Sequence, residues 1–181
     1  MPRLFLGLEI PPDVAQALLK AECSVEGARW QRSEQLHLTL VFLGEVPAER
    51  VEQAAATARL VQTAPFDLTV QGLGCFGDPA HPKALWAGVA PEAPVISLHR
   101  ELADPLVEEG FTIENRSFRP HITLSRFKRG QAASVADLLR VEQSTFFGTI
   151  PINAFALFES APGPQGSIYT VLERFNLQST G

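Results

Sequence analysis

HLTLVFLG, residues 37–44, is an apolar run that opens with His37 and carries a threonine two positions later. HITLSRF, residues 121–127, repeats this spacing with His121 and Thr123. Both runs are typical of β-strands, in which successive side chains point to opposite faces. Each strand therefore has its histidine and threonine on one face and apolar residues on the other.

The polar faces of the two strands predict a shared site. Buried polar groups that find no partner are costly, so we expect the two faces to meet across a cleft between two lobes. With a pKa near 6.5, one histidine can act as a base while the other acts as an acid. The hydroxyls of Thr39 and Thr123 can donate to phosphate oxygens. In-line opening of a phosphodiester needs a base and an acid on opposite sides of phosphorus, which His37 and His121 could supply.

A structural role for the histidines is an alternative to catalysis. A single histidine in an apolar strand is more often a core residue with satisfied hydrogen bonds than a catalyst. The repetition of the pattern in two of the four histidines argues against coincidence. His81 and His99 lack the pattern, and we expect them on the surface or in packing contacts. A domain that binds nucleotide or RNA phosphate without turnover is a further alternative.

A metal centre is disfavoured. Two histidines are too few for a closed zinc site, and no cysteine or carboxylate stands at ligand spacing beside them. Cys23 and Cys75, the only cysteines, form no CxxC pair. We therefore expect no metal and no other cofactor.

Charge points to an anionic ligand near the second segment. The chain has a formal net charge of −5, so any attraction for nucleic acid must be local. Strict alternation turns Arg126 away from His121, so Arg126 reaches a phosphate there only past a bulge or around an edge of the sheet. Arg29 and Arg32 form a weaker basic pair before the first segment. Residues 116–129 contain five basic and no acidic side chains, namely Arg116, Arg119, Arg126, Lys128 and Arg129.

Aromatic residues could offer a surface on which a base stacks. Each of them taken alone is more typical of a core position. The candidates are Trp30, Phe42, Trp86 and Tyr169.

The hydrophobic pattern predicts an α+β fold. Paired strands follow one another at several points, which favours mixed or antiparallel sheets over a doubly wound parallel sheet. The 84 residues between the two histidines suggest two related lobes within a single domain, residues 1–181. Predicted strands span about 3–10, 28–30, 37–43, 66–76, 84–89, 121–127, 144–158 and 167–178. Predicted helices span about 13–23, 48–62, 95–109 (with Pro105 as a kink or interruption) and 131–142.

The composition is that of a globular protein, with 45% hydrophobic and 19% charged residues. No apolar run approaches the roughly 18 residues of a membrane helix, and the N-terminal run is too short for a signal peptide. Two unpaired cysteines suit a reducing compartment. These features predict a cytoplasmic monomer.

The two segments resemble the HxTx motifs of the 2H phosphoesterase superfamily. Their surroundings, RWQRSEQLHLTLVFLGEV and FRPHITLSRF, resemble the RNA 2′,3′-cyclic phosphodiesterases, historically called 2′-5′ RNA ligases. The likeness extends to RLFLGLEIP at the N-terminus and to LWAGV at residues 85–89.

The resemblance implies a bilobal fold, with two sheets and flanking helices around a central cleft, and metal-independent chemistry. It implies that water opens 2′,3′-cyclic phosphate ends of RNA, or nucleoside 2′,3′-cyclic phosphates, to leave a 2′-phosphate. His37 would protonate the leaving 3′ oxygen, and His121 would activate water. Ligation through a 2′-5′ linkage would use the same groups in exchanged roles. The expected phosphate-binding residues are Thr39 and Thr123, and the candidate substrate contacts are Arg119, Arg126, Phe42 and Tyr169.

Overall fold

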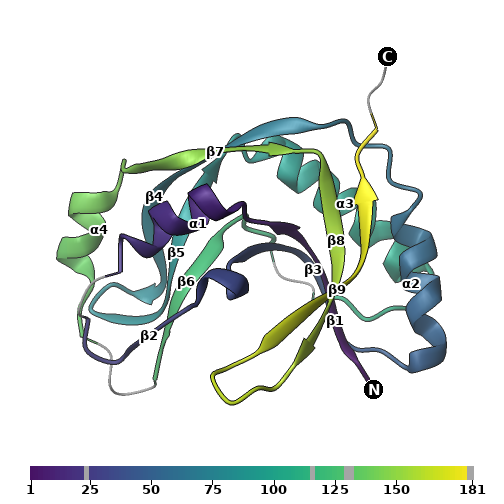
Figure 1. The fold of residues 1–181 in the computed structure, drawn as a ribbon, viewed down its shortest axis with the longest axis horizontal. Coiled ribbons are helices and arrows are strands. Elements are labelled where there is room, and N and C mark those ends of the chain that lie inside the picture. The colour runs from purple at the N-terminus through teal and green to yellow at the C-terminus, as the bar shows by residue number, and fades with distance from the viewer. Residues whose placement is uncertain (23–24, 115–116, 129–132, 179–181) are drawn as a thin grey trace.

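A single curled antiparallel sheet of nine strands organises the computed structural model, which describes residues 1–22, 25–114, 117–128 and 133–178 (Figure 1). The strand order is β7-β4-β5-β6-β3-β1-β8-β9, and β2 pairs with β6. The strands are β1 (Arg3–Glu9), β2 (Ala28–Trp30), β3 (His37–Glu45), β4 (Phe66–Asp78), β5 (His81–Ala90), β6 (Ile122–Phe127), β7 (Phe146–Ile152), β8 (Ala154–Ala161) and β9 (Ile168–Asn176).

The expectation of two separate sheets is wrong. One half of the molecule contains β1, β3, β8 and β9, and the other contains β2, β4, β5, β6 and β7 (Figure 1). The two halves join in one sheet because β3 pairs directly with β6, where Leu38 lies opposite Ile122. The α+β class and the antiparallel pairing agree with the sequence analysis.

The predicted strand over residues 144–158 is two strands. β7 pairs with β4 at one edge of the sheet, whereas β8 pairs with β1 in the other half. Only Asn153 separates β7 from β8, so the curl of the sheet must bring the edge strand β7 close to β8. A continuous apolar pattern runs through this corner, which explains why the sequence shows no break.

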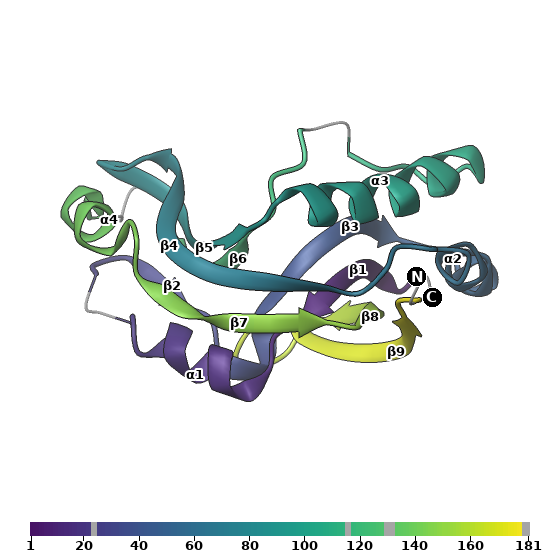
Figure 2. The ribbon, with the colours of Figure 1, turned by 90° about the horizontal axis from the view of Figure 1, so that it is seen from above.

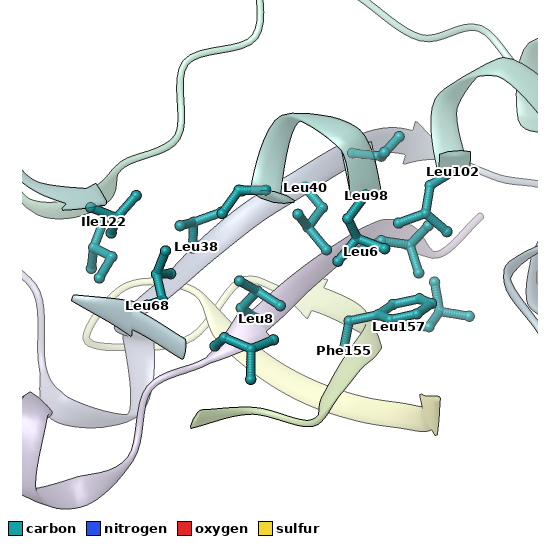
Figure 3. Packing of buried hydrophobic residues seen from close by; sticks show 14 of the residues in the cluster. Leu6, Leu8, Leu38, Leu40, Leu68, Leu98, Leu102, Ile122, Phe155 and Leu157 are labelled. Atoms are coloured by element: carbon teal, nitrogen blue, oxygen red, sulfur yellow. The ribbon is translucent and has the colours of Figure 1, made fainter. Parts of the chain in front are cut away.

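The longest helix, α3 (Ala93–Glu108), packs against the apolar face of the central strands. α1 and α3 lie on opposite sides of the molecule, with strands between them (Figure 2). Leu98 and Leu102 of α3 are fully buried with Leu38 and Leu40 of β3 (Figure 3). This leaves the opposite face of the central strands for polar residues. The helices are α1 (Pro12–Leu19), α2 (Val51–Ala58), α3 (Ala93–Glu108) and α4 (Ala136–Glu142), with short 3₁₀ helices η1 (Ser33–Gln35) and η2 (Ala48–Arg50).

The predicted helices are present with shorter bounds for α1, α2 and α4, and residues 131–132 of the fourth prediction lie outside the described part. α3 continues through Pro105, so the expected interruption is wrong. None of the helices in the described ranges is long and apolar enough to cross a membrane.

Candidate active site

The two His-Thr segments lie side by side at the centre of the sheet. Leu38 and Ile122, which face each other across β3 and β6, are fully buried. The histidine and the threonine that flank this pair in each segment project from the opposite face of the sheet. We call the resulting group the His-Thr patch; it consists of His37, Thr39, His121 and Thr123.

The patch differs in one respect from the expected cleft. The polar faces do not meet head-on from two lobes, because the two segments are neighbours in one sheet. All four side chains of the patch are half-buried. The fold therefore brings the four predicted residues together on one surface of the sheet rather than on two opposed surfaces.

Backbone carbonyls fix the tautomer of both rings. His37 Nδ1 lies 2.8 Å from the carbonyl oxygen of Gln35, which can only accept, so Nδ1 carries the hydrogen. His121 Nδ1 makes the same bond to the carbonyl of Arg119, at 2.6 Å. In the neutral rings Nε2 is therefore the acceptor. The hydroxyl of Thr39, 2.9 Å away, donates to His37 Nε2.

Burial lowers the pKa of both histidines below the ordinary 6.5, because a low-dielectric surrounding disfavours the charged ring. The bonds to the carbonyls of Gln35 and Arg119 act in the opposite direction. The charge of Arg126 lowers the pKa of both rings further. Electrostatic repulsion between the two imidazoles also lowers the pKa of His37, and the charge of Arg119 lowers the pKa of His121. Both rings therefore favour the neutral form in the free protein.

Each strand of the patch contains a β-bulge directly after its threonine. In β3, Thr39 pairs with Gly7 and Val41 with Leu6, which leaves Leu40 as the extra residue. Leu40 and Val41 are both buried, as a shift in the alternation requires.

The bulge in β6 has the same position. Thr123 pairs with Trp86 and Ser125 with Leu85, so Leu124 is the extra residue. Leu124 and Ser125 are again consecutive buried residues.

Because of the bulges, the residue five positions after each histidine also lies on the face of the patch. Phe42 follows His37 by five positions, and Arg126 follows His121 by five. The effect of Arg126 on the pKa of both rings agrees with this orientation. Of the two routes that the sequence left open for Arg126, a bulge or an edge, the bulge is present. Phe42 is 42% exposed, and the guanidinium of Arg3 lies 5.7 Å from its ring centre.

Aromatic rings surround His37. Phe5 lies 4.7 Å from the imidazole, and Tyr169 meets it edge-on at 5.0 Å between ring centres. Phe158 stacks on Phe5 at 4.8 Å and completes a small apolar cluster on this face of the sheet. Tyr169 was among the expected contacts, whereas Phe5 and Phe158 were not.

A second aromatic pair flanks His121. Phe76 meets this ring edge-on at 4.7 Å, and Trp86 lies at 6.2 Å. Gly74 permits the position of Trp86, because a Cβ there would come within 2.3 Å of the indole. Trp30, the remaining aromatic candidate, packs against the main core and also lines the pocket described next.

A pocket of about 180 Å³ opens beside His37. Its described lining comes from β2 and β6 on one side and from the tip of the β8–β9 hairpin on the other. We call it the Arg29 pocket; the residues that matter below are Arg29, Arg126, Gln35, Gln165, Ser167 and Tyr169.

The side chain of Gln35 holds the hairpin in place. Its Nε2 donates to the carbonyl of Ser167 at 3.0 Å, and its Oε1 accepts from the backbone N–H of Arg32 at 2.9 Å. Arg32 in turn donates to Gln165 Oε1 at 2.6 Å. Gln35 is 94% buried, and its carbonyl also orients His37. Gln35 thus links the first histidine to the far hairpin.

Sequence reasoning missed Gln35, Phe5 and Phe76, because their roles depend on neighbours distant in the chain. Arg119 lies beside the second ring with an exposed side chain, and Lys128 is also exposed. Arg116, Arg129 and Cys23 lie outside the described residues.

His81 is exposed at the start of β5 rather than in a loop. His99 is a packing residue, whose Nδ1 bonds to the carbonyl of Leu40 at 2.6 Å while its ring stacks on Phe118. In the part of the chain that the structure describes, no group of three or more His, Cys, Asp or Glu is arranged to hold a metal ion.

Comparisons with known proteins agree with the geometry. Residues 10–163 match the family model of the 2′-5′ RNA ligase superfamily. The chain is 32% identical over 176 residues to an RNA 2′,3′-cyclic phosphodiesterase of Archaeoglobus fulgidus, covering 96% of this chain and 99% of that protein. A protein of Thermus thermophilus with the same name is 36% identical over 186 residues, covering 97% and 90%.

Solved structures show the same fold. A crystal structure of TT0787 of Thermus thermophilus superimposes with a TM-score of 0.84 at 30% identity, covering 99% of this chain and all of that one. A structure of E. coli LigT complexed with 3′-AMP gives 0.82 at 26% identity, with the same coverage. The chain therefore belongs to the 2′-5′ RNA ligase superfamily and, within it, to the family of RNA 2′,3′-cyclic phosphodiesterases.

Proposed function

We propose that this protein hydrolyses 2′,3′-cyclic phosphate ends of RNA to 2′-phosphates without a metal ion. The observation that carries the proposal is the His-Thr patch, in which two imidazoles of the same tautomer and two hydroxyls share one face of the sheet. The relatives named RNA 2′,3′-cyclic phosphodiesterase support the choice of substrate. The E. coli LigT structure with 3′-AMP supports a nucleotide ligand.

The reaction begins with attack of water on phosphorus. His121 Nε2 takes a proton from the water as its oxygen bonds to phosphorus. The bond between phosphorus and the 3′ oxygen breaks on the opposite side, and its electron pair stays on that oxygen. His37, which takes up a proton at Nε2 when the phosphate anion binds beside it, then supplies this proton, which leaves a free 3′-hydroxyl and a 2′-phosphomonoester.

The carbonyl bonds suit these exchanges. Nδ1–H donates to its carbonyl in both protonation states of each ring, so only Nε2 gains or loses a proton. The direction of the reaction, with His37 as acid and His121 as base, follows the motif resemblance, because both rings have the same tautomer and the same kind of Nδ1 hydrogen bond.

The remaining residues of the site stabilise charge. The hydroxyls of Thr39 and Thr123 donate to the non-bridging oxygens, on which negative charge builds up. Binding a phosphate anion requires Thr39 to leave His37 Nε2, which frees that nitrogen to act on the leaving oxygen. Arg126 adds a positive charge on the same face.

Ligation is the related reaction with a different nucleophile. If a 5′-hydroxyl of RNA replaces water, the same steps give a 2′-5′ phosphodiester and a 3′-hydroxyl. The base and the acid then have the same roles as in hydrolysis, not the exchanged roles expected from the resemblance, so the patch can serve both reactions.

Product analysis tests the proposal directly. An oligoribonucleotide with a 2′,3′-cyclic phosphate end is incubated with the protein in excess EDTA, with and without a second RNA that has a 5′-hydroxyl. We expect addition of one water and a 2′-phosphate, identified by ³¹P NMR. A 3′-phosphate as the main product would contradict the assigned leaving group. Tight binding of the cyclic end with no product would indicate a binding module instead.

A further inference from the structure

Two arginines face each other across neighbouring strands in the Arg29 pocket. Arg29 of β2 pairs directly with Arg126 of β6, so both side chains project from the same face of the sheet. Arg126 acts electrostatically on both histidines, and Arg29 lies one strand further out, about 4.8 Å away in the pairing direction. The pair thus places positive charge both beside the His-Thr patch and in the pocket.

This arrangement favours an anion between the two strands. Like charges directly opposite each other destabilise a sheet unless a counter-charge is present. None of the described residues that line the pocket is acidic. Hydrogen-bonding groups of Gln35 and Ser167 border the same space, and Tyr169 separates it from His37.

The size of the pocket suits part of a ligand. Sites for a whole small molecule usually measure about 300–1,000 Å³, whereas this pocket measures about 180 Å³. Because it adjoins the His-Thr patch, a ligand bound at the histidines can extend a second group into it. A guanidinium pair selects a phosphate for that group, since arginine binds phosphate oxygens in a bidentate manner.

We propose that the Arg29 pocket binds the 5′-phosphate of the terminal nucleotide, the phosphate that joins the cyclic end to the rest of an RNA strand. The proposal rests on the function proposed above and narrows its substrate class. The enzyme would act better on the ends of RNA strands than on nucleosides with a cyclic phosphate alone. Arg29 is then a specificity-determining residue that does not touch the reacting atoms.

The test compares two small substrates that differ in one group. One is a nucleoside 2′,3′-cyclic phosphate, and the other is the same compound with a 5′-phosphate. For the parent protein we expect the 5′-phosphate to raise kcat/KM by about tenfold, mainly through KM, as a charged hydrogen bond would. The gain should shrink as the salt concentration rises.

Substitution of Arg29 should remove this gain selectively. The Arg29→Gln variant should hydrolyse both substrates with the kcat/KM that the parent has for the nucleoside cyclic phosphate. The Arg29→Lys variant should keep part of the gain in kcat/KM that the 5′-phosphate gives. Arg100→Gln is the matched control, since Arg100 is an exposed residue of α3, which packs on the other face of the sheet. Circular dichroism checks that the variants are folded.

The outcomes separate this inference from the proposed function. Equal kcat/KM for the two substrates in the parent, or an unchanged gain in Arg29→Gln, would overturn the phosphate subsite while leaving cyclic phosphate hydrolysis intact. Failure of the parent to hydrolyse either substrate would instead overturn the proposed function.

Discussion

Single hydrogen bonds decide what each histidine of the patch can do. Because Nδ1 of His37 and of His121 donates to a carbonyl two residues upstream, each ring presents Nε2 as its reactive atom. The carbonyl acceptors belong to Gln35 and Arg119, and any residue at those positions would supply the same group. The side chains at these positions therefore gave no signal of this role in the sequence.

Removal of either ring should abolish most of the turnover. His37→Ala and His121→Ala each lose a positioned acid or base, so we expect kcat to fall by about 10²–10⁴-fold. The measurement is hydrolysis of a nucleoside 2′,3′-cyclic phosphate. His81→Ala, which removes an exposed histidine at the start of β5, is the control and should keep the parent rate. Turnover by either patch variant within tenfold of the parent would refute the acid–base pair.

The lowered pKa values of the histidines also predict how stability depends on pH. The folded protein binds protons at these rings less readily than the unfolded chain, whose histidines titrate near 6.5. Unfolded molecules therefore bind more protons as the pH falls below 6.5, and the free energy of unfolding decreases. Above that pH the rings are neutral in both states, and their contribution is complete.

His37→Gln should weaken this dependence, because glutamine cannot titrate. We expect the Tm of the parent to fall more steeply between pH 7.5 and about 5 than the Tm of the variant. Thermal unfolding followed by circular dichroism measures the difference. Parallel curves for the two proteins over this range would show that burial of His37 does not lower its pKa in solution.

At the scale of the strands, two equivalent bulges shape the site. Each lies immediately after the His-x-Thr segment, at Leu40 in β3 and at Leu124 in β6. Strict alternation of side chains would place Arg126 on the core face, where an unpaired guanidinium would be costly. The bulge reverses its orientation and places the charge beside the histidines. Phe42 occupies the equivalent position in β3. The strand β3 therefore has an aromatic ring where β6 has the guanidinium of Arg126.

Arg126→Gln should change both the rate and its pH dependence. We expect kcat to fall by about 10²-fold, as for other groups that stabilise developing phosphate charge. Because Arg126 lowers the pKa of both rings, its loss should raise the pKa of His37 and of His121. NMR titration of the imidazole C–H signals measures this shift.

Arg140→Gln is the matched control for this charge change. Arg140 is an exposed residue of α4, where it pairs with Asp137. The control should leave both imidazole titrations unchanged. If Arg126→Gln gives unchanged titrations too, Arg126 does not project toward the patch, and the proposed effect of the bulge in β6 fails.

At the scale of the whole molecule, α3 supports the central strands from behind. Leu98 and Leu102 pack fully buried against the apolar residues of β3, on the face opposite the patch (Figure 3). The other face, with its half-buried histidines, is thereby left to the ligand. Stability and chemistry consequently depend on different faces of the same two strands.

Leu102→Ala should therefore destabilise the fold without changing the chemistry. We expect a loss of about 2–5 kcal/mol in the free energy of unfolding, from lost burial and the remaining cavity. Urea denaturation measures it, and kcat of the folded variant should match the parent. Val107→Ala on the same helix is the control, because Val107 is 55% exposed and should have little effect. A large drop in kcat for folded Leu102→Ala would show that the two faces are coupled.

The sequence by itself determined which side chains make up the patch. A period of two places histidine and threonine on one face of any strand, so the repeat of His37–Thr39 at His121–Thr123 specified four polar groups without knowledge of the fold. Local patterns also specified nearly all of the strands and helices, since hydrophobic periodicity depends on neighbouring residues only.

Only the tertiary structure decided how these elements meet. The pairing of Leu38 with Ile122 makes one sheet instead of two, and it depends on residues 84 positions apart. The corner at Asn153, the bulges after Thr39 and Thr123, and the closure of the Arg29 pocket by the β8–β9 hairpin have the same origin. Each of these features depends on which strands are neighbours in the sheet. The pairing of two distant segments leaves no periodic pattern in the sequence of either segment.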